Sequence, residues 1–203
     1  MFKIFNDSSM PHKKIDDKLT SFCEQRDISE QKSIELSERA KQVIKRIKEL
    51  KKGMKMLPDD LPNEFQKAID SAVENMQEEL TNEAKDIAES ADEARAAADN
   101  TLFELRRESE RLSKKARNID FICSFPLLGS LGEKNSADIH TTLNEIIELS
   151  HETNEYYESL LYSKNLIKDY INSLLYSVVY YLSLSRSFTA TTHRLWICIY
   201  WRR

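Results

Sequence analysis

The hydrophobic residues of this chain recur at helical spacing over most of its length. From Pro62 to about Ile119 they repeat roughly every eleven residues, which is close to a whole number of natural helical turns. A helix with this repeat can run long with little supercoil, and at about 1.5 Å per residue it would be on the order of 85 Å long. Such a helix needs partner helices along its length. The stripe comprises Ile69, Val73, Met76, Leu80, Ala84, Ile87, Ala91, Ala94, Ala98, Leu102, Leu105, Leu112, Ala116 and Ile119.

A second stripe precedes this helix and follows a heptad spacing. We expect its helix to begin at Ser29, a good N-cap residue, after a shorter amphipathic piece that stops near Asp27. Pro58 and Pro62 enclose a short connection at 58–62, which favours an antiparallel hairpin with the long helix. The stripe comprises Leu36, Ala40, Val43, Ile47, Leu50, Met54 and Leu57.

A third long helix is predicted after Ser136, and it becomes apolar all round from Ile171 to Leu184. A second hairpin turn is expected between the long helix and this one, at 120–135. The tip of that hairpin, 119–132, is apolar, whereas loops are ordinarily polar because they lie in water. We therefore expect this tip to drive association with a protein or a membrane. Its candidate residues are Phe121, Ile122, Phe125, Leu127, Leu128 and Leu131.

These patterns predict an all-α fold, an elongated antiparallel helical bundle or coiled coil with two or three long helices. The expected body covers 14–186 and follows a disordered leader at 1–13. The tail 187–203 does not fit the helical pattern, and its Leu195 to Trp201 run is β-prone. We expect this tail to be either a membrane-interface anchor or a segment without selected structure.

Charge supports the two hairpins. A basic block at 45–55 would face the acidic start of the long helix, and folding at residue 60 would bring Arg46 near Glu74. A second basic block at 106–117 would face the acidic segment 138–158 in the same way. Pairs of exposed charges are worth only about 0.2–1 kcal/mol each, enough to select an orientation. This interpretation makes nucleic acid an unlikely partner for the first block, which also lacks interleaved aromatic residues.

The composition argues against nucleotide-binding folds that need glycine-rich loops. The chain has only 3 glycines in 203 residues, too few for a phosphate-cradling loop or a doubly wound fold. The last 34 residues hold four arginines and no acidic residue, a net charge of +4. The preceding residues hold 26 of the 30 Lys and Arg and all 34 Asp and Glu, a net charge of −8.

Catalytic and metal-binding patterns are weak. Glu148 and His151 have the Glu-x-x-His spacing of di-iron bundles, but the second such motif that a site requires is missing. The three cysteines, Cys23, Cys123 and Cys198, have no metal-ligand spacing and no disulfide framework. We therefore expect no enzyme activity, no metal and no cofactor.

The resulting hypothesis is a non-enzymatic interaction or structural protein that acts through self-association or a protein partner. The alternative is a membrane-active protein that uses the tip and the apolar C-terminal region. In outline, the order of long helix, apolar tip and long return helix resembles the α-helical pore-forming toxins, although this tip is shorter than their apolar tongues. Without a signal peptide, a cytoplasmic location is expected, with peripheral membrane association possible.

Overall fold

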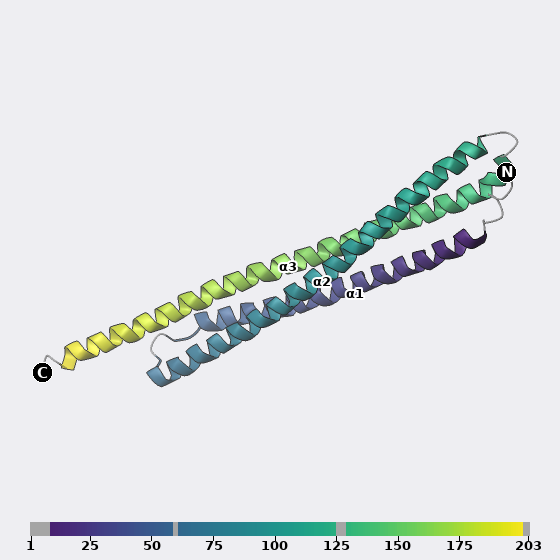
Figure 1. Cartoon of the computed structure of the whole chain (residues 1–203). Coiled ribbons are helices and arrows are strands. Elements are labelled where there is room, and N and C mark those ends of the chain that lie inside the picture. The colour runs from purple at the N-terminus through teal and green to yellow at the C-terminus, as the bar shows by residue number, and fades with distance from the viewer. Residues whose placement is uncertain (1–8, 59–60, 125–128, 201–203) are drawn as a thin grey trace. The chain divides into compact units, whose positions relative to one another are not determined.

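The protein consists of three long α-helices (Figure 1). The computed structural model describes residues 9–58, 61–124 and 129–200. Helix α1 covers Ser9–Lys55, α2 covers Asn63–Cys123, and α3 covers Gly129–Tyr200. In these three segments there is no β-strand, so the predicted all-α bundle is confirmed.

Helix α1 differs from the prediction because it has no break near Asp27. It begins at Ser9, inside the expected leader, with Pro11 in the first turn, where the missing N–H is tolerated. Ser29 is not an N-cap. Its side chain is buried, and its hydroxyl donates a hydrogen bond of 3.0 Å to the carbonyl of Gln25 within the helix.

Helix α3 also exceeds its predicted bounds. It begins at Gly129, before the expected start at Ser136, and its backbone is helical to Tyr200. The expectation that 187–203 leaves the helical pattern is therefore wrong as far as Tyr200. After Gly132 the chain contains neither glycine nor proline, so it lacks the residues that most often end helices.

The chain divides into two compact units, and each takes one stretch from every helix. Unit 1 consists of residues 1–35 and 91–161, and unit 2 consists of 36–90 and 162–203. The single body predicted for 14–186 is thus made of two packing units.

The core of unit 2 consists of aliphatic side chains from all three helices, and it contains the predicted heptad stripe of α1 from Leu36 to Met54. Leu57, the last residue of that stripe, is half-buried and follows the end of α1. Contact pairs give the helix directions. Arg39 binds Asp86 at 2.6 Å and Arg46 binds Glu79 at 2.6 Å, so α1 and α2 are antiparallel. The buried residues are Leu36, Ala40, Val43, Ile44, Ile47, Leu50, Met54, Val73, Leu80, Ala84, Ile87, Ile167, Leu174 and Val178.

The partners of the first basic block correct the predicted pairing. Arg46 binds Glu79 and Glu83 and not Glu74, so the register is displaced from a fold at residue 60. Other members of the block contact α3. Lys48 lies 5.3 Å from the centre of the Tyr170 ring, and Lys51 donates a 2.7 Å hydrogen bond to the hydroxyl of Ser173.

Unit 1 has an apolar cluster between α2 and α3, on which the start of α1 packs. Antiparallel α2 and α3 are joined by Arg95, whose guanidinium donates a 2.9 Å hydrogen bond to the hydroxyl of Tyr157. The buried members are Leu105, Leu112, Ala116, Ile139, Ile146 and Leu149, and half-buried Leu19, Phe22, Cys23, Ile119 and Leu143 pack against them.

The predicted pairing of the second basic block, 106–117, with the acidic segment 138–158 is also wrong for the two arginines whose ion pairs are described. Arg107 binds Glu104 at 3.0 Å and Arg111 binds Glu108, so both pairs lie within α2. On the acidic face of α3, Glu152 accepts a hydrogen bond of 2.7 Å from Arg26 of α1.

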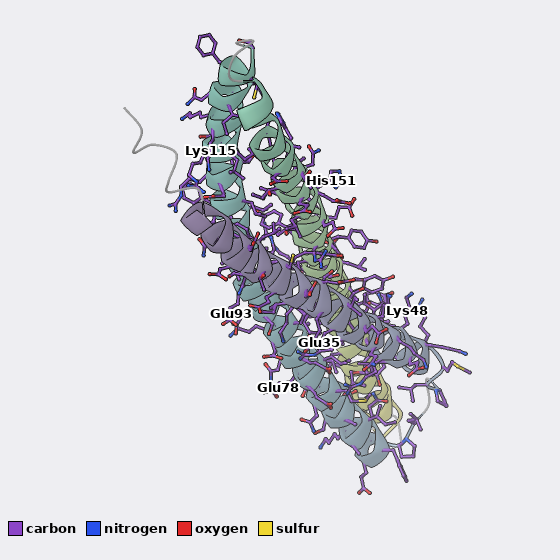
Figure 2. All side chains as sticks on the ribbon, turned by 90° about the vertical axis from the view of Figure 1, so that its right-hand side faces the viewer. Glu35, Lys48, Glu78, Glu93, Lys115 and His151 are labelled. Atoms are coloured by element: carbon purple, nitrogen blue, oxygen red, sulfur yellow. The ribbon has the colours of Figure 1, made fainter. Side chains whose placement is uncertain are left out.

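Charged side chains lie on the outside of the helices, as the amphipathic pattern predicts. Figure 2 shows Glu93, Lys115 and His151 projecting from the helices of unit 1, and Lys48 and Glu78 projecting from those of unit 2. Exposed apolar side chains and buried charged ones are exceptions to this pattern, and they are therefore the candidate functional positions.

Candidate association surface

The C-terminal half of α3 exposes large apolar side chains in unit 2. Tyr176 is 79% exposed and Tyr180 is 66% exposed, and Val179 and Leu184 are exposed beside them. Their spacing of three, four and eight residues places them on one side of the helix. We call this set, Tyr176, Val179, Tyr180 and Leu184, the uncharged face.

The opposite side of α3 packs into the core of unit 2. Leu174 and Val178 are fully buried in the core of unit 2. Residues 170–185 contain no charged side chain, so α3 is apolar on both sides here. A helix that is apolar all round is ordinarily covered all round, and unit 2 covers only part of it.

Polar contacts with α2 determine which side of α3 turns outward. The amide of Gln66 donates a 3.2 Å hydrogen bond to the hydroxyl of Tyr181, and Ser185 donates one of 3.3 Å to Asp70. Burial raises the pKa of Tyr181, so its phenol stays neutral. These contacts hold Tyr181 against α2, and they leave its neighbour Tyr180 on the solvent side.

Charged residues bound the uncharged face at both ends. Asp169 precedes the uncharged run and Arg186 follows it. Arg186 also contacts Glu74 of α2, with 3.7 Å between the nitrogen and the carboxylate oxygen. The uncharged run therefore follows the pair Lys168 and Asp169, and it ends at Arg186.

The predicted tip is only partly within the described residues. Phe121 is exposed in the last turn of α2. Ile122 and Leu131 belong to α2 and α3, but their side chains lie outside the description. The other three tip candidates, Phe125, Leu127 and Leu128, lie outside it altogether. The role of the tip as an interaction site stays a prediction.

A polar contact joins α2 to α3 beside the tip. Asp120 accepts a 2.7 Å hydrogen bond from the hydroxyl of Ser136, and its other oxygen lies 3.2 Å from Nε2 of His140. The hydrogen bond from Ser136, followed by that from His140, lowers the pKa of Asp120. This contact aligns the two helices and leaves Asp120 exposed.

Among the residues singled out for metal or thiol chemistry, those whose side chains the structure describes do not form a site. Nδ1 of His151 lies 3.4 Å from a carboxylate oxygen of Glu155, one turn along α3, and both are exposed. Within the described residues, no three His, Cys, Asp or Glu side chains are placed to hold a metal ion. Cys23 and Cys123 are half-buried free thiols.

The spacing of the apolar residues did not predict the buried carboxylate of Glu108 in unit 1. A signal for it existed, because the apolar stripe of α2 skips from Leu105 to Leu112 and Glu108 occupies the position between them. The buried serines of α1 left a similar signal, since Ser29 and Ser33 continue the stripe backward from Leu36.

In the segments that the structure describes, no helix has an apolar stretch long enough to cross a membrane. Comparison of the chain with protein-family models, with curated proteins and with solved structures gives no match.

Proposed function

We propose that this protein is a non-enzymatic helical bundle that acts by association, and that its uncharged face binds the same face of a second copy. The observation that carries the proposal is the exposure of Tyr176, Val179, Tyr180 and Leu184 on a helix without a charge from 170 to 185. Tyrosine is a residue type enriched where protein surfaces associate, because it combines a large apolar area with a hydroxyl that tolerates water.

Self-association is favoured because the face is complementary to itself in an antiparallel arrangement. Pairing centred near Val178 lays Tyr176 of one copy on Tyr180 of the other, twice by symmetry. The same pairing brings Asp169 of each copy close to Arg186 of the other. A parallel pairing would instead oppose like charges at both ends, which is unfavourable.

The membrane-active alternative rests on a different observation, the net charge of +4 and the absence of acidic residues in the last 34 positions. Basic and aromatic residues together suit an anionic lipid surface. The uncharged face itself has no basic residue within 170–185, so it fits a second copy better than a lipid headgroup layer.

The decisive measurement is the molar mass of the full chain in solution as a function of concentration. We expect a dimer whose dissociation constant rises by about tenfold or more in the double variant Tyr176→Ser and Tyr180→Ser, because central aromatic residues dominate interface energetics. Phe103→Ser is the matched control, since Phe103 is an exposed aromatic residue of unit 1. It should leave the dimer unchanged.

A charge exchange tests the antiparallel order. Asp169→Arg should weaken the dimer, and adding Arg186→Asp to it should restore the association. A chain that is monomeric at every concentration contradicts the proposal. A monomer that floats with anionic vesicles in a manner that depends on Tyr176 and Tyr180 would instead assign the face to a membrane.

A further inference from the structure

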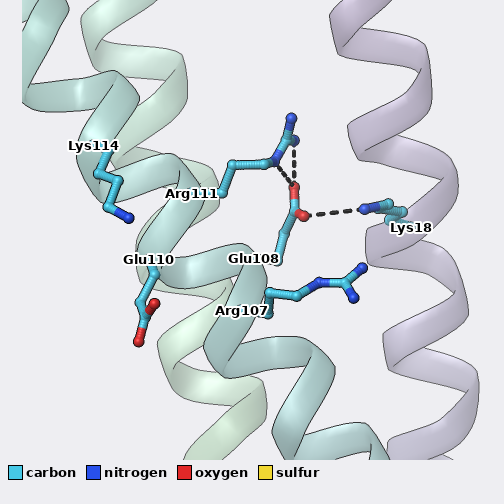
Figure 3. Close-up of a pocket in the computed structure, with 6 residues that line it drawn as sticks. All are labelled: Lys18, Arg107, Glu108, Glu110, Arg111 and Lys114. Carbon is cyan, nitrogen blue, oxygen red and sulfur yellow. Dashed lines mark hydrogen bonds and ion pairs between the residues drawn. The ribbon is translucent and has the colours of Figure 1, made fainter.

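Unit 1 contains a cleft between α1 and α2 that is lined only by charged side chains (Figure 3). Its volume is about 460 Å³. The lining residues are Lys18, Arg107, Glu108, Glu110, Arg111 and Lys114. Four of the six are cationic and two are carboxylates, so the lining has a net charge of +2.

The centre of the cleft is Glu108, whose side chain is only 5% exposed. It accepts a 3.0 Å hydrogen bond from the ammonium group of Lys18 on α1 and hydrogen bonds from the guanidinium of Arg111 on α2. Burial opposes ionisation of Glu108, but the hydrogen bonds from Arg111 and Lys18 outweigh it, and the pKa lies below the ordinary glutamate value. The ionised carboxylate therefore holds one cation on each side of the cleft.

The remaining charges are distributed unevenly. Figure 3 shows Arg107 and Arg111 on the side of α2 that faces Lys18, and Glu110 and Lys114 on the other side of that helix. The side that faces α1 thus combines three cations, Lys18, Arg107 and Arg111, with Glu108. Glu104 also binds Arg107 at 3.0 Å, so the net charge of this group is +1. Each guanidinium has five N–H donors, so the bonds from Arg111 to Glu108 and from Arg107 to Glu104 use only part of their capacity.

We propose that this cleft binds a phosphate-type oxyanion, held by Lys18, Arg107 and Arg111. Guanidinium groups match the geometry of phosphate oxygens with paired hydrogen bonds. Glu108 keeps two of the cations in place before the ligand arrives, which lowers the ordering cost of binding. The negative charge of the oxyanion would neutralise the excess positive charge on this side of the cleft.

The same phosphate chemistry is presented by a soluble polyphosphate and by a phosphorylated lipid headgroup. The two sources are distinguished by calorimetric titration of the full chain with inorganic pyrophosphate and by flotation with vesicles that contain a phosphoinositide. Vesicles of neutral lipid are the reference for the second assay. Binding in both assays or in either one supports the cleft, provided that it depends on Arg107.

The variant Arg107→Gln removes one donor and leaves the Glu108 network in place. We expect it to weaken binding by about tenfold or more, because a charge-assisted hydrogen bond to the ligand is lost. Arg106→Gln is the matched control, since Arg106 is an exposed arginine of α2 that does not line the cleft. Its effect should be about twofold or less, as expected for a screened charge outside the site.

Circular dichroism of each variant shows whether the helices are intact before binding is compared. Equal weakening by Arg107→Gln and Arg106→Gln would overturn the proposal, because it would indicate general attraction to a basic helix. Failure of the unchanged protein to bind either pyrophosphate or phosphoinositide vesicles would overturn it as well. The result is independent of dimer formation if the Tyr176→Ser and Tyr180→Ser variant binds equally well.

Discussion

Helix α1 is held differently in the two units that it enters. In unit 2 it buries seven apolar side chains between Leu36 and Met54. In the described part of unit 1 its buried residues are two serines, Ser29 and Ser33, while Leu19 and Phe22 are half-buried. One continuous helix thus packs by apolar area at one end and largely by polar contacts at the other.

The polar contacts of α1 in unit 1 are specific, but they contribute less to stability than the apolar burial of α1 in unit 2. Ser33 donates a 2.9 Å hydrogen bond to Ser159, and Arg26 binds Glu152 at 2.7 Å. A hydrogen bond contributes about 0.5–1.5 kcal/mol to stability, whereas full burial of one large aliphatic side chain contributes about 1.5–3 kcal/mol. We therefore expect α1 to detach more readily in unit 1 than in unit 2, with polar contacts defining its alignment.

The largest effect is expected from truncating an apolar residue in unit 2. Ile47→Ala should lower the free energy of unfolding by about 2–5 kcal/mol, because Ile47 is fully buried and its loss leaves a cavity. Ser33→Ala, at a stripe position of the same helix in unit 1, should cost about 1 kcal/mol or less. Both free energies are measured by urea denaturation, with helicity as the signal. A larger loss of stability in Ser33→Ala than in Ile47→Ala would contradict the comparison.

The second effect concerns the buried carboxylate of unit 1. Glu108→Gln should cost about 1–3 kcal/mol at neutral pH, since Lys18 and Arg111 lose their ionised partner. The pKa of Glu108 is lower in the folded chain than in the unfolded one, so its contribution is present above about pH 4.3 and is lost as pH falls further. The difference in stability between the unchanged chain and Glu108→Gln should shrink below that pH. A difference independent of pH would contradict this assignment.

The third effect concerns local opening. Backbone amides of α1 at 16–35 should exchange with deuterium about tenfold faster than those at 36–55, which corresponds to about 1.4 kcal/mol less opening free energy. Native-state hydrogen exchange with peptide-level resolution provides the measurement. Equal protection of the two stretches would show that the polar contacts hold α1 as firmly as the apolar core.

The smallest effect is a predicted gain in stability. The hydroxyl oxygen of Thr153 is buried and has no hydrogen-bond partner among the described residues. Thr153→Val should therefore raise the free energy of unfolding by about 1 kcal/mol, because the desolvated hydroxyl is removed. Thr141→Val serves as its control, since the exposed Thr141 hydroxyl donates a 3.0 Å bond to the carbonyl of Ala137. Thermal unfolding compares the two, and a loss of stability in Thr153→Val would point to a partner for its hydroxyl.

Much of the core could be predicted from spacing alone. Leu80, Ile87, Leu105 and Leu112 of the eleven-residue stripe are fully buried, as expected from their shared face. Met76 belongs to the same stripe but is 40% exposed, because it lies at the edge of that face. The failures occurred where polar residues occupy stripe positions. The spacing predicted Ser29 as an N-cap and gave no role to Glu108, because a pattern of apolar residues does not identify buried polar ones.

The sequence by itself determined that the chain forms long helices and, outside the uncharged stretch of α3, which side of each helix is buried. These properties depend on spacing along one chain, and few glycines or prolines interrupt it. Only the tertiary structure decided which charges pair, as Arg46 and Arg111 illustrate. Exposed pairs differ in energy by less than about 1 kcal/mol, and long side chains reach several partners, so core packing selects among them. The outward side of α3 was decided in the same way, because an uncharged helix has no periodicity to mark the side that α2 covers.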